Sequence, residues 1–237
     1  MTHAAGGDDA RGAAQPPLAV RARGLRKRFG FKDTLKGVDI ALDEGQRFVV
    51  FGPNGAGKST LLRILATQWS FSAGEVEVLG RRLPGERVAL RREIGLVLHD
   101  SFLRAELTLE ENLRFACDLH DLRFAAVRER VEALLVRVSL LPRRHDRVGT
   151  FSQGMKKRAS LVLSLLHAPR LWILDEPFSG LDPEGQELLG ELITDFSGNG
   201  RTVLLVTHHE SRGLALATRW IRMRDGRVAE ADGGRAA

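Results

Sequence analysis

The chain has 237 residues, of which 43% are hydrophobic, and this is enough to build the core of one domain or of one domain with a subdomain. Its longest apolar runs, such as residues 161–166 and 171–174, are far shorter than the roughly 20 residues of a membrane-spanning helix, so no transmembrane segment is predicted. The net charge of +6 comes from basic residues spread over the whole chain, without a basic run or interleaved aromatic residues, so no nucleic-acid partner is expected.

The two ends of the chain are rich in small and polar residues. Residues 1–17 are predicted to form a disordered tail and residues 229–237 a flexible C-terminal tail. The first 17 residues also lack the apolar stretch of a secretory signal, and the single cysteine, Cys117, cannot form an internal disulfide. A cytoplasmic location is therefore expected.

Between the tails, short segments predict two kinds of strand. Segments that alternate polar and apolar residues favour an antiparallel flank: residues 20–25, 38–42 and 75–79. Two runs rich in Val, Leu and Ile predict strands buried on both faces, residues 171–174 and 202–206, and a further short apolar strand is predicted at residues 48–51. Strands of this second kind belong to a parallel sheet that is covered by helices, so the core is predicted to be a mainly parallel α/β structure.

A helical subdomain is predicted at about residues 101–166, inserted between strands of the core. Thr108, with Glu111 three residues later, has the spacing of a capping box at the start of a helix. Residues 127–141 then repeat apolar residues with a period of 3.6, as an amphipathic helix does.

A phosphate-binding loop is predicted directly after the strand at residues 48–51. The pattern G-x-x-x-x-G-K-[ST] is matched by Gly52, Pro53, Asn54, Gly55, Ala56, Gly57, Lys58, Ser59 and Thr60. Glycines let backbone N–H groups approach phosphates, and the following helix directs the positive end of its dipole at them. Lys58 would neutralise phosphate charge and the Ser59 hydroxyl would bind Mg²⁺, whereas the alternative is a glycine-rich turn that only caps a helix.

Two adjacent carboxylates, Asp175 and Glu176, end the apolar run at residues 171–174. The C-terminal end of a parallel strand lies in the crevice where α/β sheets bind ligands, so Asp175 can reach the Mg²⁺ shell. Glu176 can act as general base toward the attacking water. The alternative is a solvated acidic pair at the start of a loop. These motifs predict a nucleotide hydrolase and leave GTPases, kinases and helicases open.

A third motif narrows the class. Phe151-Ser152-Gln153-Gly154-Met155 opens a predicted helix, and by itself it is an ordinary serine N-cap. In this place it resembles the signature sequence of ABC transporter ATPases, although Phe, Gln and Met replace the usual Leu, Gly and Gln. The resemblance covers roughly residues 20–228 and implies a nucleotide-binding domain at residues 18–228 with the P-loop ABC ATPase fold.

The resemblance also assigns roles to single residues. Phe29 lies where the family has an aromatic residue that stacks on adenine, although a core or edge aromatic is the alternative. Ser152, Gln153 and Gly154 match the residues that cap the ATP of a second subunit. Residues 179–182, ending in Asp182, resemble the loop that crosses the dimer interface. His208 resembles the histidine that contacts the γ-phosphate.

One position departs from the family and points to a subfamily. The family usually has a Gln after the strand at residues 94–98, where it senses Mg²⁺ and water, whereas this chain has His99 followed by Asp100. An imidazole can still bind a metal or water, so His99 is a candidate metal ligand. The stretch around His99, and residues 208–217, resemble the haem-exporter ATPases of cytochrome c maturation (CcmA type).

The resemblance implies an ATP-binding and ATP-hydrolysing subunit that uses Mg²⁺ and powers a membrane transporter. It would act as a homodimer or heterodimer at the inner face of the membrane, bound to an integral membrane permease, without binding the transported substrate itself. The transporter is expected to be an exporter, with haem for cytochrome c maturation as the candidate cargo. The alternatives are a drug or antibiotic exporter, an importer, a soluble ABC ATPase without a transport role, and a scaffold that does not hydrolyse ATP.

Overall fold

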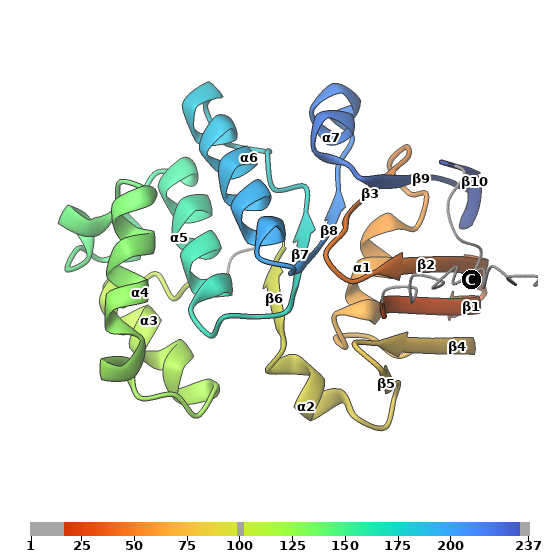
Figure 1. Cartoon of the computed structure of the whole chain (residues 1–237), viewed down its shortest axis with the longest axis horizontal. Helices are drawn as coiled ribbons and strands as arrows, with labels where there is room; N and C mark the ends of the chain where they lie inside the picture. The colour runs from red at the N-terminus through yellow and green to blue at the C-terminus, as the bar shows by residue number, and fades with distance from the viewer. Residues whose placement is uncertain (1–16, 99–101, 233–237) are drawn as a thin grey trace, which may run out of the picture.

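The computed structural model describes residues 17–98 and 102–232 (Figure 1). The predicted N-terminal tail therefore lies outside the described residues except for Pro17, and His99 lies outside them as well. Within the described ranges, no helix combines the length and the apolar character that crossing a bilayer requires.

The main sheet of the described chain has six strands, in the order β10-β9-β3-β8-β7-β6. Its members are β3 (Arg47–Phe51), β6 (Ile94–Val97), β7 (Leu171–Asp175), β8 (Thr202–Val206), β9 (Arg219–Arg224) and β10 (Arg227–Ala231). All neighbours are parallel except β9 and β10, which are antiparallel. The predicted mainly parallel core is confirmed.

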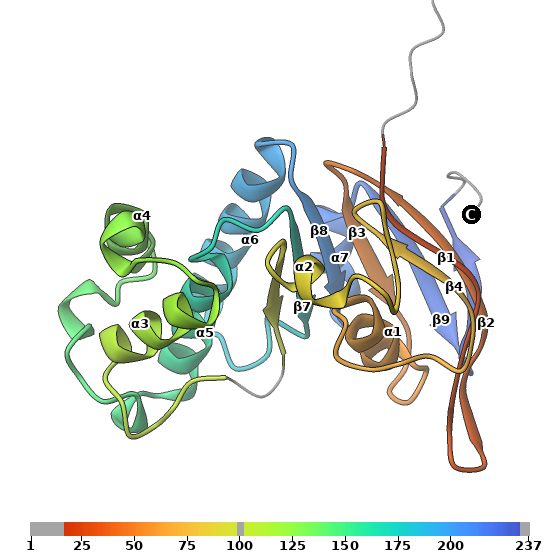
Figure 2. The same cartoon turned by 90° about the horizontal axis from the view of Figure 1, so that it is seen from below.

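A second sheet flanks the first and is antiparallel throughout its described strands (Figure 2). It has the order β2-β1-β4-β5, made of β1 (Leu18–Phe29), β2 (Lys32–Asp43), β4 (Ala73–Val78) and β5 (Arg81–Arg82). Helix α1 (Lys58–Leu65) lies between the two sheets, and its buried leucines share one core cluster with strands of both. The predicted antiparallel flank is confirmed.

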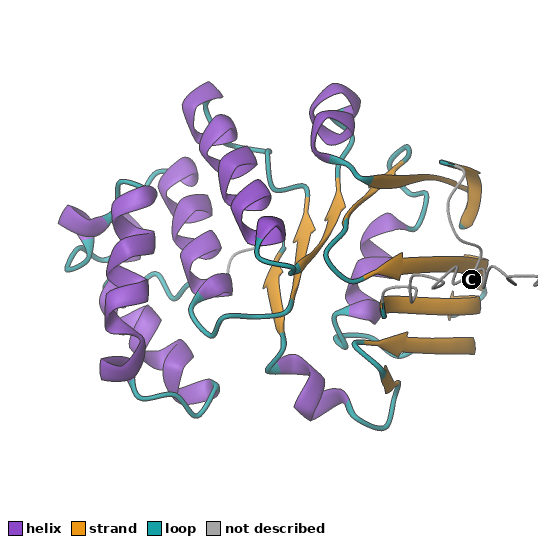
Figure 3. Cartoon of the chain, in the orientation of Figure 1, coloured by secondary structure: helices purple, strands orange, loops and turns teal. Residues whose placement is uncertain are grey.

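Helices form the other side of the molecule (Figure 3). Between β6 and β7 come α3 (Leu109–Leu119), α4 (Phe124–Arg137), two short 3₁₀ turns (Leu141–Arg143 and Val148–Thr150) and α5 (Gln153–Leu165). The remaining helices are α2 (Arg87–Arg91), α6 (Pro183–Gly198) and α7 (Glu210–Leu216). The predicted capping box is confirmed, because Glu111 N donates to Thr108 Oγ1 and Thr108 N donates to the Glu111 carboxylate.

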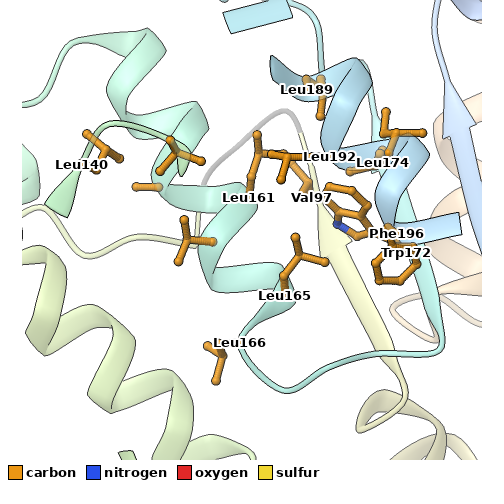
Figure 4. Close-up of a cluster of buried hydrophobic side chains, with 14 of the residues drawn as sticks. Val97, Leu140, Leu161, Leu165, Leu166, Trp172, Leu174, Leu189, Leu192 and Phe196 are labelled. Carbon is orange, nitrogen blue, oxygen red and sulfur yellow. The ribbon is translucent and has the colours of Figure 1, made fainter. Parts of the chain in front are cut away.

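Alternating side chains of β7 enter two different hydrophobic clusters. Trp172 and Leu174 pack toward α5 and α6, whereas Leu171 and Ile173 pack toward α1 and the antiparallel sheet. The indole of Trp172 is fully buried against Phe196, with ring centroids 5.2 Å apart (Figure 4). Because β7 is covered on both faces, its C-terminal end is held rigidly where the acidic pair begins.

The ordered chain extends beyond the predicted boundary at residue 228. Strand β10 runs to Ala231, and the carboxylate of Asp232 accepts hydrogen bonds from Arg219 Nε at 2.8 Å and from Trp220 N at 2.9 Å. Backbone pairing with β9 and this ion pair fix residues 229–232, which composition alone placed in a flexible tail. Residues 233–237 lie outside the described part of the chain.

Candidate functional site

The predicted phosphate loop (residues 52–60) begins at the C-terminal end of β3, an interior strand of the main sheet, and leads into α1. Its first residue, Gly52, has φ 143°, and a Cβ atom there would lie 2.2 Å from the Met223 carbonyl oxygen. Gly57 has φ 98°, and a Cβ there would lie 2.8 Å from Leu35 Cδ2. Both positions therefore require glycine, and the loop closes tightly enough to present its backbone to a ligand.

Lys58, the first residue of α1, lies inside the curve of the loop. Its ammonium donates to the carbonyl oxygens of Gly52 at 2.7 Å and Pro53 at 3.0 Å. Burial lowers the pKa of Lys58, and the charges of Glu176 and Asp175 oppose this shift. The loop thus holds a largely desolvated cation, which suits the binding of a phosphate group.

Asp175 ends β7 beside Ser59 of the phosphate loop. The Asp175 side chain is almost fully buried, and its Oδ1 accepts a hydrogen bond of 3.2 Å from Ser59 Oγ. Burial raises the pKa of Asp175, and the hydrogen bond from Ser59 opposes the shift. A hydroxyl and a carboxylate at this distance are oxygen donors of the kind that Mg²⁺ prefers, so the predicted ligands fit the metal.

Glu176 follows Asp175, and contacts with the end of β8 and with His208 fix its position. Its backbone N–H donates to the Val206 carbonyl at 3.0 Å, at the end of β8. Its Oε2 accepts from His208 N at 3.3 Å and lies 2.9 Å from His208 Nδ1. The structure therefore brings together Glu176 and His208, which lie 32 residues apart in the sequence.

Two pockets open beside the phosphate loop, and Glu176 lines both. One, of about 430 Å³, is lined by Gly52, Pro53, Asn54, Glu176, Ser179 and His208. The other, of about 270 Å³, is lined by Lys32, Thr34, Asn54, Gly55, Gly57, Lys58, Ser59, Thr60 and Glu176. Ala56, inside the loop, is buried. The two pockets share Asn54 and Glu176, so the phosphate loop and Glu176 line adjoining spaces.

Phe29 lies beside this site without lining either pocket. Its ring is 42% exposed, packs edge-on against Trp69 at a centroid distance of 5.2 Å, and has the Lys27 ammonium 4.7 Å from its centroid. In the β1–β2 register Phe29 is directly opposite Lys32, which does line the pocket. Directly opposed residues share a face of the sheet, so an exposed aromatic ring is available near the loop.

The signature residues lie at the start of α5. Ser152 is the N-cap of this helix and accepts a hydrogen bond of 3.2 Å from Met155 N, as its N-cap interpretation predicts. Gln153 is exposed at the first helical position, and a Cβ on Gly154 would lie 3.5 Å from the Gly180 carbonyl. These three residues line neither pocket of their own chain.

Asp182 has a local structural role in the described chain. It is the N-cap of α6, and its Oδ1 accepts a hydrogen bond of 2.9 Å from Gly185 N. Asp182 is exposed and, like the signature residues, lines neither pocket. Its predicted contact with nucleotide remains a prediction.

Sequence reasoning missed three residues that approach the site from other segments. Lys32 and Thr34 reach the phosphate loop from β2. Lys157 reaches Glu176 from α5, and its ammonium donates to the Glu176 carbonyl at 3.3 Å. None belongs to a recognisable motif. Gly57 packs tightly against Thr34, so β2 covers the loop, but this contact is visible only in the structure.

The chain is similar to known proteins over most of its length. A family model described as "ABC transporter" matches residues 35–179. The chain is 38% identical over 210 residues to the daunorubicin resistance ATP-binding protein DrrA3 of Streptomyces coeruleorubidus, a match that covers 89% of this chain and 66% of that protein. It is 33% identical over 190 residues to the linearmycin resistance ATP-binding protein LnrL of Bacillus subtilis, covering 80% and 61% of the two chains.

A third relative is the Nod factor export ATP-binding protein I of Rhizobium johnstonii, which is 35% identical over 192 residues, or 81% of this chain and 62% of that protein. The chain thus spans just under two thirds of the length of these three relatives. Their names give the predicted similarity to haem exporters no support and favour the drug or antibiotic alternative.

Solved structures share the whole fold. The structure of an ATP-binding subunit of an ABC transporter superposes with a TM-score of 0.85 at 30% identity, covering 90% of this chain and 89% of that one. A dimeric ATP-binding cassette bound to ADP and Pi in a post-hydrolysis state has a TM-score of 0.82 at 26% identity, covering 90% and 97%. Together with the family match, these similarities show that the chain belongs to the ABC transporter family and has the fold of its ATP-binding subunits.

Proposed function

We propose that this chain binds ATP with Mg²⁺ at the phosphate loop and hydrolyses it to ADP and phosphate. The observation that carries the proposal is the position of Glu176. Its carboxylate is held by His208, and Glu176 lines one pocket with His208 and the adjoining pocket with Lys58 and Ser59. A base, a phosphate-binding cation and a pair of metal ligands therefore converge on one space, as phosphoryl transfer requires.

Each residue has a definite task in this reaction. Lys58 and the loop N–H groups bind the β- and γ-phosphates, and Ser59 and Asp175 would hold Mg²⁺, which offsets phosphate charge when bound. Glu176 accepts the proton of the water whose oxygen attacks the γ-phosphorus, and the bond to the β-γ bridging oxygen breaks. His208 orients the Glu176 carboxylate through the 2.9 Å contact and, as the family resemblance implies, would contact the γ-phosphate from the pocket that it shares with Glu176.

Phosphate release tests the proposed reaction. The purified chain should release phosphate from ATP in the presence of Mg²⁺, and Glu176→Gln should lower kcat by at least about 100-fold, because the amide cannot accept the proton. Glu191→Gln, the same change on the exposed face of α6, is the matched control and should keep the parent rate. Rapid turnover by Glu176→Gln would remove Glu176 from the role of base.

We further propose that the chain powers a membrane transporter as one of two ATP-binding subunits bound to an integral membrane permease at the inner face of the membrane. The family match and the solved dimeric cassette support this arrangement. The names of the drug-resistance and Nod factor relatives support an exporter, and the transported molecule would be bound by the permease.

Copurification tests the transport role. A tagged chain solubilised from membranes should retain a permease, and cells with the active chain should resist an antibiotic that inhibits cells carrying Glu176→Gln. If the retained permease takes its substrate up in proportion to ATP hydrolysis, the export direction is wrong. If no membrane protein is retained and resistance is unchanged, the transport role itself fails.

A further inference from the structure

Glu176 has a backbone conformation that other parts of the molecule must maintain. Its φ of 46° lies in the left-handed region, which non-glycine residues adopt only where the surroundings compensate for the strain. Its N–H is bound to the end of β8, at the Val206 carbonyl. Its carbonyl oxygen accepts two hydrogen bonds of 3.3 Å, one from the ammonium of Lys157 and one from Ser179 N. The peptide units on both sides of Glu176 are therefore each held by a separate element.

Lys157 is placed unusually for a lysine. It lies one turn into α5, its side chain is partly buried, and its ammonium points at a backbone carbonyl next to the acidic pair. Burial lowers its pKa, while the charges of Asp175 and Glu176 oppose the shift. Removing a lysine ammonium from water is unfavourable unless a specific contact compensates for it, and the Glu176 carbonyl supplies that contact.

The packing of α5 does not depend on this lysine. The helix is anchored to the core by apolar side chains, among them Ala159, Leu161 and Val162, which are at most 1% exposed. The ammonium is directed at the Glu176 carbonyl, where it and Ser179 N together hold the peptide plane that follows Glu176. That plane sets the direction in which the carboxylate meets His208.

We infer that Lys157 is a positioning residue for Glu176, which it holds by its backbone so that the carboxylate stays aligned with His208. This inference rests on the proposed role of Glu176 as the base. Lys157 would act through Glu176 without touching ATP. It would also tie the start of α5, with Ser152 at its N-cap, to the hydrolytic carboxylate of the same chain.

Steady-state kinetics test the inference through the separation of kcat from KM. Lys157→Met keeps the length of the side chain and removes the donor, so kcat should fall about 10- to 100-fold, because misalignment of a reacting group costs rates of this order. The KM for ATP should stay within about twofold, since Lys58 and the loop are unchanged. Lys157→Arg can still donate to the carbonyl and should recover most of the rate.

Lys156→Met is the matched control. Lys156 is the neighbouring lysine on α5, and its carbonyl accepts a hydrogen bond from Ser160 Oγ. Within the described part of the chain its ammonium makes no hydrogen bond or ion pair, so Lys156→Met should keep the parent kcat. Binding of a fluorescent ATP analogue to Lys157→Met should match the parent protein, which would show that the variant is folded.

Three results would overturn the inference. The first is a kcat of Lys157→Met equal to that of the parent protein, and the second is a loss of ATP-analogue binding in that variant. The third is a Lys157→Arg variant that is as slow as Lys157→Met. Glu176→Gln, assayed beside them, separates the two proposals. If Glu176→Gln turns over at the parent rate, the proposed function fails, whereas an inactive Glu176→Gln beside a fully active Lys157→Met overturns the role of Lys157 alone.

Discussion

At the scale of single residues, the buried charge of the Asp175 carboxylate lowers the stability of the fold. Asp175 is 4% exposed, and its hydrogen-bond donor is the neutral hydroxyl of Ser59. Burial raises its pKa in the folded protein above the value in the unfolded chain. The folded state therefore binds the proton more tightly, and stability is lost as pH rises through the carboxyl's titration range. A bound cation would remove this cost.

Asp175→Asn is accordingly expected to stabilise the protein when Mg²⁺ is absent. The amide keeps the shape and removes the buried charge, so the free energy of unfolding at pH 7 should rise by on the order of 1 kcal/mol, or about 2–4 °C in Tm. The same variant should lose Mg²⁺-dependent ATP hydrolysis. Calorimetry in EDTA measures the first effect, with exposed Asp118→Asn as control. A fall in Tm specific to Asp175→Asn would contradict this account of the charge.

The residues predicted from the sequence and those that were missed differ in how far their partners lie along the chain. Lys58 and Ser59 belong to a contiguous sequence motif whose residues determine the conformation of the loop, so their positions in the site could be predicted. The contact between Lys157 and the Glu176 carbonyl joins a helix to a strand end and uses a backbone acceptor that leaves no trace in the sequence. Such a contact depends on how α5 packs, which no local pattern specifies.

At the scale of elements, α3 and α5 meet through a pair of histidines. His120, the C-cap of α3, stacks on His167 just after α5, with ring centroids 4.0 Å apart and planes 14° apart. His167 Nε2 also lies 3.0 Å from the Ile94 carbonyl of β6. Burial, followed by the charge of His120, lowers the pKa of His167 to about 4. Burial also lowers the pKa of His120.

This pair predicts that acid weakens the helical side of the molecule. The unfolded chain binds a proton at His167 near pH 6.5 whereas the folded chain does so only near pH 4, so stability falls as pH drops through that window. Between pH 7 and pH 5 the loss from His167 is about 2 kcal/mol. In urea denaturation, the free energy of unfolding at pH 7 should exceed that at pH 5, and His167→Gln should reduce this excess by about that amount. Exposed His145→Gln should leave the excess unchanged. An unchanged difference in His167→Gln would contradict the depressed pKa.

Elements were predictable where one physical pattern dominated. The strands at β3, β7 and β8 are continuous apolar runs because both faces of the sheet are covered, and the sequence shows this directly. The hairpin of β9 and β10 was not predicted, because its strands carry many arginines and only one face is covered. Asp225-Gly226 is a hairpin turn signal that could have revealed it.

At the scale of the whole molecule, only some of the predicted nucleotide-binding residues lie together in the described chain. The phosphate loop, Asp175, Glu176 and His208 converge, whereas Ser152 and Gly154 lie at the start of α5 and line neither pocket. A helix N-terminus that carries a positive dipole end and is exposed to solvent suits the γ-phosphate of a second subunit. We therefore expect ATP to join two copies head to tail.

Light scattering combined with size-exclusion chromatography of Glu176→Gln tests this account most directly, because the variant should bind ATP without hydrolysing it. With Mg²⁺ and ATP it should elute at twice the monomer mass and retain unhydrolysed ATP, and with Mg²⁺ and ADP it should elute as a monomer. A monomer in both nucleotides, or a dimer that has converted its ATP to ADP, would contradict the account.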